Sequence, residues 1–170
     1  MQALGLVWGN LDPVNADLLE ERAPIEFPTQ YGARLLLDHW RARNGGMGFV
    51  VGRDVPARPL ASVLRNIALF EPVDDHADFR MRLAGTAFMR RYGRDVTGLK
   101  LSDIYDAKTF EEERANLLEI ADKKYPEIFD VKVTREGRVF QKFEALRLPV
   151  LSPDRRETWV MGALFYSDWS

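Results

Sequence analysis

Apolar and polar residues in the first third of the chain follow helical spacing. In Tyr31–Arg43 the apolar residues form one stripe and the charged residues lie opposite, which predicts an amphipathic helix. Asp12 followed by Pro13 is a helix-start signal, so we expect an earlier helix that runs to about Arg22. Residues 1–66 are therefore expected to form an N-terminal helical extension rather than an independent domain.

From residue 67 the pattern changes to the two-residue period of strands. In Phe79–Leu83 apolar residues alternate with arginines, as expected of a half-buried strand. The last such segment, Thr158–Tyr166, is apolar on both faces, so both of its faces need a cover. A helix over Thr109–Lys123, opened by a capping box of Thr109 and Glu112, is expected to cover one face. The N-terminal helices or a second subunit would cover the other. The five expected strands are Ile67–Pro72, Phe79–Leu83, Ile128–Thr134, Val139–Leu148 and Thr158–Tyr166.

The segment after the second strand predicts two short helices separated by a turn. Thr86 can cap a helix over Ala87–Tyr92, and Gly93 stands where the end of a helix needs a left-handed residue. A second short helix is expected at Leu101–Tyr105. Farther along, Glu136 and Gly137 predict a tight hairpin turn.

This order of elements resembles the PAS domain, and it is closest to a short, stand-alone bacterial PAS-like subfamily. The resemblance covers about residues 35–166. It implies an α+β fold with a five-stranded antiparallel sheet, helices on one face and the N-terminal helical extension packed on the other. Residues 67–168 would form the PAS-like core. The segments that carry the resemblance are Leu36–Arg43 (LLDHWRAR), Arg82–Gly98 (RLAGTAFMRRYGRDVTG), Glu144–Pro149 (EALRLP) and the pair Gly162-Ala163.

The resemblance implies a non-enzymatic sensor or adaptor in bacterial signal transduction. Such a protein binds a small ligand, a signalling partner such as a kinase, or both. Homodimerisation through the N-terminal helices follows by the same analogy. Ligand sensing requires an internal cavity, whereas an adaptor requires a filled core and an exposed apolar patch.

Composition and charge narrow the partners. The formal net charge of −2 over 170 residues gives no electrostatic footprint for nucleic acid. No apolar run approaches the roughly 20 residues of a membrane helix, so no membrane contact is expected. We therefore expect a cytoplasmic protein.

Cofactors of the PAS class are not expected. PAS photosensors that form a flavin adduct or carry a cinnamoyl chromophore need a cysteine, and this chain has none. The helix Thr109–Lys123 has no histidine that could hold haem, because the two histidines are His39 and His76. His76 lies beside Asp74, Asp75 and Asp78, but short-spaced aspartates in a turn are typical turn formers, so no metal is expected.

The interior face of the long helix is the expected ligand site. Arg114 lies on its apolar stripe with Phe110, Leu117, Leu118 and Ala121. A buried guanidinium needs a partner, so Arg114 is interpreted as the contact for an anionic ligand. In the alternative, Arg114 points outward or pairs with Glu111 or Glu144. The other candidate lining residues, which could instead simply fill a core, are Phe79, Phe88, Tyr92, Leu117, Phe129, Phe143 and Trp159.

Catalytic motifs are weak in this sequence. It contains neither a glycine-rich phosphate loop nor a serine in a nucleophile elbow. The alternative to a sensor or adaptor is a small α+β-cone isomerase or lyase with a buried acid and base, for which Asp130 and Tyr166 would be the pair. The basic pair Arg90-Arg91 is expected on a solvated face, with partner docking as its other interpretation.

Overall fold

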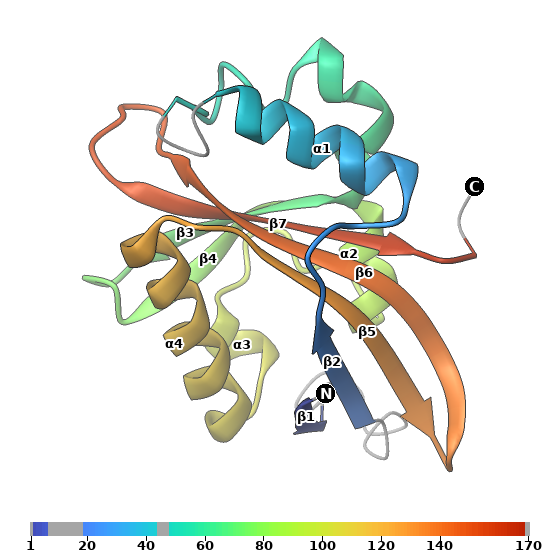
Figure 1. Ribbon diagram of the computed structural model, residues 1–170. Coiled ribbons are helices and arrows are strands. Elements are labelled where there is room, and N and C mark those ends of the chain that lie inside the picture. The colour runs from blue at the N-terminus through green and yellow to red at the C-terminus, as the bar shows by residue number, and fades with distance from the viewer. Residues whose placement is uncertain (1, 7–18, 44–47, 169–170) are drawn as a thin grey trace.

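The computed structural model describes residues 2–6, 19–43 and 48–168, and its described strands form one antiparallel sheet. The order of strands across this seven-stranded sheet is β1-β2-β5-β6-β7-β3-β4 (Figure 1). All five expected strands are confirmed, and β1 and β2 extend the sheet beyond the edge of β5. The bounds are β1 Gln2–Leu6, β2 Leu19–Pro24, β3 Ile67–Val73, β4 Asp78–Ala84, β5 Glu127–Arg135, β6 Arg138–Leu151 and β7 Thr158–Tyr166.

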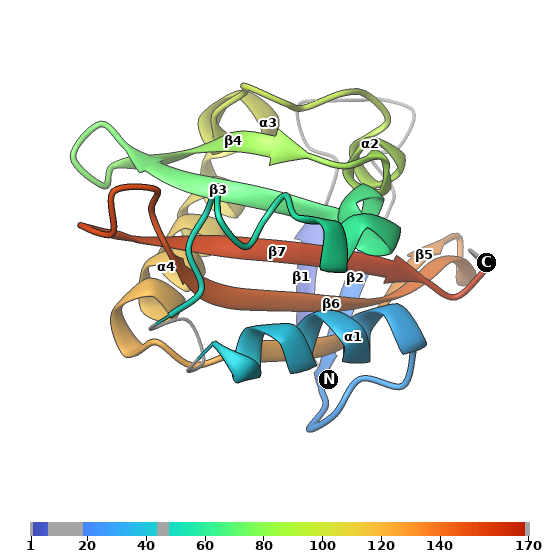
Figure 2. The same cartoon turned by 90° about the horizontal axis from the view of Figure 1, so that it is seen from above.

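Helices cover both faces of the sheet. On one face, here called the α4 face, lie α2 (Thr86–Tyr92), α3 (Leu101–Ile104) and α4 (Ala107–Lys123). On the other, the α1 face, lie α1 (Tyr31–Ala42) and the 3₁₀ helix η2 (Arg58–Asn66). Figure 2 shows α1 lying over β6 with η2 beside it. This arrangement confirms the expected α+β fold.

Strand β7 belongs to both cores. Trp159, Met161, Ala163 and Phe165 are buried on the α1 face, while Val160, Leu164 and Tyr166 are buried on the α4 face. Helix α1 of the same chain therefore provides the cover that the sequence left open. Its Trp40 donates from Nε1 to the carbonyl oxygen of Pro149 at 2.7 Å, which ties the helix to β6.

The glycine of the Gly162-Ala163 pair has a packing role. A Cβ at Gly162 would lie 2.7 Å from Cε2 of Phe70 on the neighbouring strand. Glycine therefore lets the Phe70 ring approach the backbone of β7 closely.

The prediction of a helix that runs to about Arg22 is wrong for residues 19–22. Leu19–Pro24 is a strand whose six residues pair in antiparallel register with β5. The two buried residues of this strand are Glu20 and Arg22. Burial therefore alternates along β2 as in other strands, but the buried side chains are charged. A hydrophobic pattern cannot reveal such a strand. The expected helical residues 13–18 lie outside the described residues.

The expected turns are confirmed. Gly93 has a φ of 76° and donates its N–H to the carbonyl of Met89 at 2.8 Å, which closes α2. Glu136 and Gly137 have φ values of 51° and 75°, as a two-residue hairpin turn requires. Helix α4 begins two residues before the expected start, because the carboxylate of Asp106 accepts the N–H of Thr109 at 2.8 Å.

Candidate functional site

The core on the α4 face contains a small cavity between the sheet, α2 and β2. Its volume is about 20 Å³. This is room for about one water molecule, whereas ligand sites typically measure about 300–1,000 Å³. Its walls are Glu20, Arg22, Phe70, Phe88, Arg91, Tyr92, Phe129, Phe143, Ala145, Leu146, Arg147, Gly162, Ala163 and Leu164.

Four of the aromatic residues expected to line a cavity do so. They are Phe88, Tyr92, Phe129 and Phe143. Phe79 and Leu117 are buried in the same core but are not among the walls. Trp159 is buried in the core of the α1 face, on the other side of the sheet. Whether any of these residues contacts a ligand stays a prediction.

Arg114 does not face the interior. Its side chain is partly exposed, and its guanidinium lies 3.5 Å from the carboxylate of Glu111, which is one of the alternatives that the sequence offered. The buried positions of α4 are instead Thr109, Glu113, Leu117 and Ile120. The buried stripe is thus displaced by one position, and the charged residue on it is the acid Glu113.

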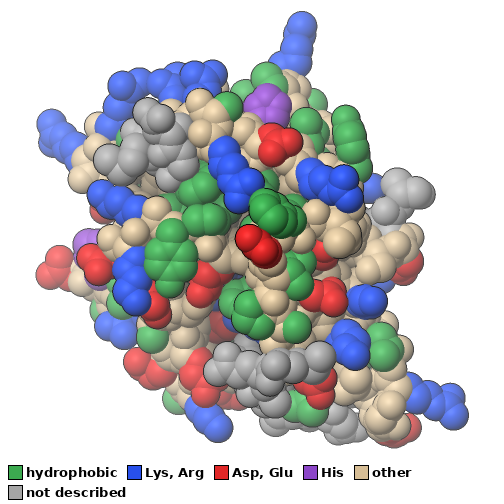
Figure 3. Space-filling view, in the orientation of Figure 1, with side chains coloured by type: hydrophobic (Ala, Val, Ile, Leu, Met, Phe, Trp, Pro, Cys, Tyr) green, Lys and Arg blue, Asp and Glu red, His purple; other side chains and the backbone are tan. Residues whose placement is uncertain are grey.

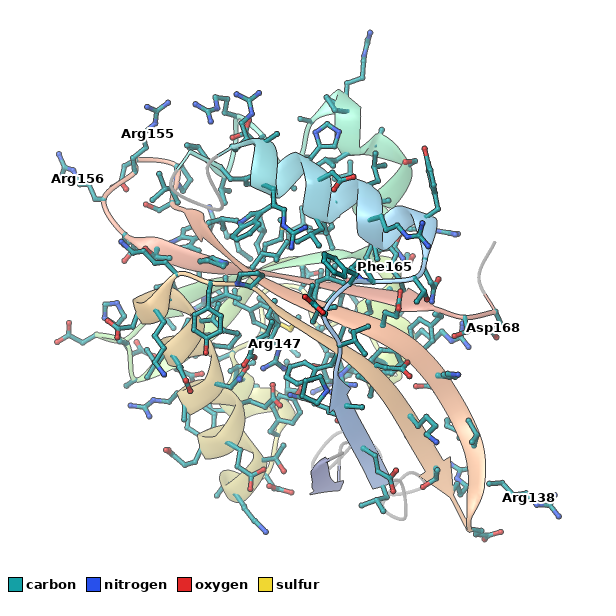
Figure 4. The ribbon with its side chains drawn as sticks, in the orientation of Figure 1. Arg138, Arg147, Arg155, Arg156, Phe165 and Asp168 are labelled. Atoms are coloured by element: carbon teal, nitrogen blue, oxygen red, sulfur yellow. The ribbon has the colours of Figure 1, made fainter. Side chains whose placement is uncertain are left out.

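Glu113 belongs to a cluster of charges beside the cavity, which we call the charged cluster: the buried Glu20, Arg22, Arg91 and Glu113, and the partly buried Arg147. The guanidinium of Arg91 donates to both oxygens of Glu20, at 2.7 and 3.0 Å. Arg22 donates to Glu113 at 2.8 Å, and Arg147 donates to the other oxygen of Glu113. The cluster joins β2 to α2, α4 and β6, and Figure 4 shows Arg147 between the sheet and α4.

The arginines keep both buried carboxylates ionised. Burial alone would raise the pKa of Glu113, but Arg147 and Arg22 lower it to about 2. Burial also opposes the charge on Glu20, yet Arg91 and Arg22 hold its pKa below the usual value. The reciprocal effect of Glu20 raises the pKa of Arg91 well above its usual range, against the effect of burial. The cluster therefore stays charged at neutral pH.

Two tyrosines extend this polar region into the core. The hydroxyl groups of Tyr92 and Tyr105 are hydrogen-bonded to each other, and both side chains are buried. Burial raises the pKa of Tyr105 well above its usual value. Tyr105 therefore remains a neutral phenol, suited to hydrogen bonding rather than to proton transfer at neutral pH.

The prediction that Arg91 lies on a solvated face is wrong. Arg91 is 4% exposed, while Arg90 lies over the ring of Tyr166 at 3.9 Å and pairs with the exposed Asp168. A signal was present in the sequence, because position 91 falls within the apolar stripe of Ala87, Phe88 and Tyr92. Glu20 and Arg22 carried no comparable signal, since they stand in a segment whose pattern favoured a helix.

The acid and base of the enzymatic alternative are not brought together. Tyr166 is buried in the core of the α4 face, with its hydroxyl 3.4 Å from Gln141. Asp130 lies opposite Glu144 across β5 and β6, and both line a hollow at the outer surface of the α1 face. The sheet separates Asp130 from Tyr166.

Two further features of the described residues bear on function. Within residues 2–6, 19–43 and 48–168, no group of three or more His, Asp or Glu side chains is placed to hold a metal ion. In the same ranges, no helix is long and apolar enough to span a membrane.

The antiparallel sheet, with α2, α3 and α4 enclosing a small interior on one face, defines an α+β domain of PAS type. A family model of the PAS domain matches residues 29–165, and the chain belongs to this family. The family is one of sensor and signalling modules. No curated protein and no solved structure is significantly similar to the chain. The division at residue 67 stays a prediction.

Proposed function

We propose that the chain is a non-enzymatic adaptor in bacterial signal transduction that acts by binding a signalling protein, such as a kinase. The observation that carries this proposal is the small size of the cavity between α2, β2 and the sheet on the α4 face, which measures about 20 Å³. In this conformation the core has no room for a larger ligand, so such a domain presents its signal at its surface.

Phe27, which precedes α1, and Tyr31 and Arg41 of α1 form an exposed surface suited to such contact, which we call the α1 surface. Phe27 and Tyr31 are 60% and 81% exposed, and Arg41 lies 5.8 Å from the Phe27 ring. Aromatic residues and arginine are enriched at protein interfaces and dominate their binding energy. Figure 3 shows hydrophobic side chains set among charged ones on this side of the molecule.

Strand β6 anchors the backbone of the segment that leads into α1. The carboxylate of Glu144 on β6 accepts the backbone N–H of Thr29 at 2.8 Å and that of Gln30 at 2.9 Å. It also accepts the hydroxyl of Thr29 at 2.9 Å. A buried carboxylate at the start of a helix satisfies amides that would otherwise lack partners. The backbone between Phe27 and Tyr31 is therefore anchored before docking, which reduces the backbone entropy lost on binding.

The test joins identification of a partner with reconstitution. A photo-reactive amino acid at position 31 of the full chain captures neighbouring proteins, and each candidate is then purified and titrated against the unlabelled chain. We expect a signalling protein whose affinity falls at least about tenfold in Phe27→Ala/Tyr31→Ala, because aromatic anchors carry about 2 kcal/mol or more. The matched control is Tyr125→Ala, since Tyr125 is 42% exposed at the end of α4.

Two outcomes would overturn the proposal. One is equal loss of affinity in Tyr125→Ala and in the double variant. The other is a concentration-dependent dimer that the double variant abolishes, because the α1 surface would then bind a second copy of the chain.

A further inference from the structure

Arg91 has the surroundings of an anion-binding site. Arg91 is 4% exposed, and its guanidinium carbon lies 5.4 Å from the ring centre of Tyr92 and 5.4 Å from that of Phe143. All three residues form walls of the cavity. A guanidinium is a fixed fork of donors that matches the two oxygens of a carboxylate. In this structure the carboxylate in that fork is the one of Glu20.

Glu20 comes from outside the part of the chain that defines the family. The PAS match covers residues 29–165, which include Arg91, Glu113 and Arg147, whereas β2 ends at Pro24. The domain therefore supplies the arginine, and an additional strand supplies the acid. Strand β2 lies between β5 and the terminal strand β1, so it is close to one edge of the sheet. Strands near an edge open at a lower free-energy cost than central strands.

We propose that Arg91 is a binding site for a small carboxylate, and that Glu20 occupies this site as an internal ligand in the closed conformation. Without Glu20, the remaining carboxylate of the charged cluster is Glu113, which is already held by Arg22 and Arg147. A buried guanidinium without an acid is strongly unfavourable, and an entering carboxylate removes that cost.

The size of the site sets the class of ligand. The side chain of glutamate beyond Cα is a propionate group, and the adjoining cavity adds about 20 Å³ between Phe88, Phe143 and Leu164. A monocarboxylate with a short apolar body fits this combined space. When it binds, Glu20 leaves Arg91, and β2 loses its main polar anchor to α2.

The first experiment uses propionate as the probe and the full chain with Glu20→Ala. We expect saturable binding in an NMR titration at constant ionic strength, and no binding of the neutral isostere propionamide. Propionate should bind the unaltered chain at least about tenfold more weakly than it binds Glu20→Ala, because the tethered Glu20 competes at high effective concentration. The variant Glu20→Ala/Arg91→Met removes both charges together and should bind no propionate. If Glu20→Ala does not fold alone, the titration is done as a refolding assay, in which propionate but not propionamide should restore the folded state.

The second experiment separates a ligand site from a purely structural ion pair. In the unaltered chain, propionate should speed hydrogen exchange of the β2 amides while leaving those of β3 unchanged. A carboxylate that only fills a hole left by mutation would not affect the unaltered chain. The proposal is overturned if Glu20→Ala fails to bind propionate, or if exchange in β2 is unchanged at concentrations that saturate Glu20→Ala. Neither result decides the test of the α1 surface, because that test measures affinity for a partner protein.

Discussion

The two faces of the sheet hold their helices by different means. On the α1 face, the helix packs with apolar side chains, and the buried acid Glu144 bonds to backbone amides of the helix start. On the α4 face, α2, α3 and α4 also pack with apolar side chains, and in addition five charged side chains join α2 and α4 to β2 and β6. Apolar burial is stabilising at about 25 cal/mol per Å², whereas a buried ion pair gains little over apolar residues of the same shape. The α1 face is thus fixed by apolar packing, whereas the α4 face combines apolar packing with ion pairs that need every partner to be present.

The largest effect is expected from breaking one pair on the α4 face. Arg91→Met leaves Glu20 charged and buried, and should lower the free energy of unfolding by about 3–5 kcal/mol in urea denaturation. Its matched control is Arg90→Met, because Arg90 pairs with the exposed Asp168. The control should lose about 1 kcal/mol or less. Equal losses in the two variants would contradict the distinction between these neighbouring arginines.

The α1 face should lose stability through packing alone. Leu36 is 0% exposed on α1, so Leu36→Ala should lower the free energy of unfolding by about 3 kcal/mol. The half-buried Leu35 on the same helix gives the control, since Leu35→Ala should cost clearly less. The loss in Leu36→Ala should also be the same at low and high salt. A strong dependence on salt would show that charges hold this face as well.

Acid should weaken the α4 face selectively. The pKa of Glu113 is lowered from its model-compound value of 4.5 to about 2 in the folded chain. The resulting stability is present above pH 4.5 and is lost as the pH falls towards 2, because the unfolded chain takes up the proton first. The free energy of unfolding should therefore fall by roughly 3 kcal/mol between pH 5 and pH 2 on account of this one group. Glu113→Gln should flatten this part of the pH profile, and an unchanged slope would contradict the assignment.

The smallest effect is expected at the acid of the α1 face. Glu144→Gln keeps one acceptor but removes the charge from four hydrogen bonds with Thr29 and Gln30, so we expect a loss of about 1 kcal/mol. Hydrogen exchange should quicken at the start of α1 and remain unchanged in α4. The half-buried Glu71 on β3 provides the control, Glu71→Gln, for a general loss of acidic charge. Faster exchange throughout the chain in Glu144→Gln would contradict a local role.

Sequence patterns predicted the five core strands, the turns at Gly93 and Gly137, and both covered faces of β7, because these depend on local periodicity and on backbone conformation. The identity of the buried charges could not be predicted in the same way. Whether Glu113 or Arg114 faces inward depends on a rotation of α4 by one position, which is fixed by packing and by the cap at Asp106. Glu20 and Arg22 become interior residues only because β5 offers an edge for pairing, and that partner lies more than 100 residues away.

Strand β6 gives the molecule a short route between its two faces. Successive side chains of a strand point to opposite sides, and here Phe143 and Ala145 contact the cavity while Glu144 holds the start of α1. A sliding or tilting of this one strand would therefore move the cavity wall and the Thr29–Gln30 anchor together, with no intervening side chains to relay the change. Strand β6 thus couples the two faces directly, because the residues that contact the cavity and the residue that anchors α1 are neighbours in the chain.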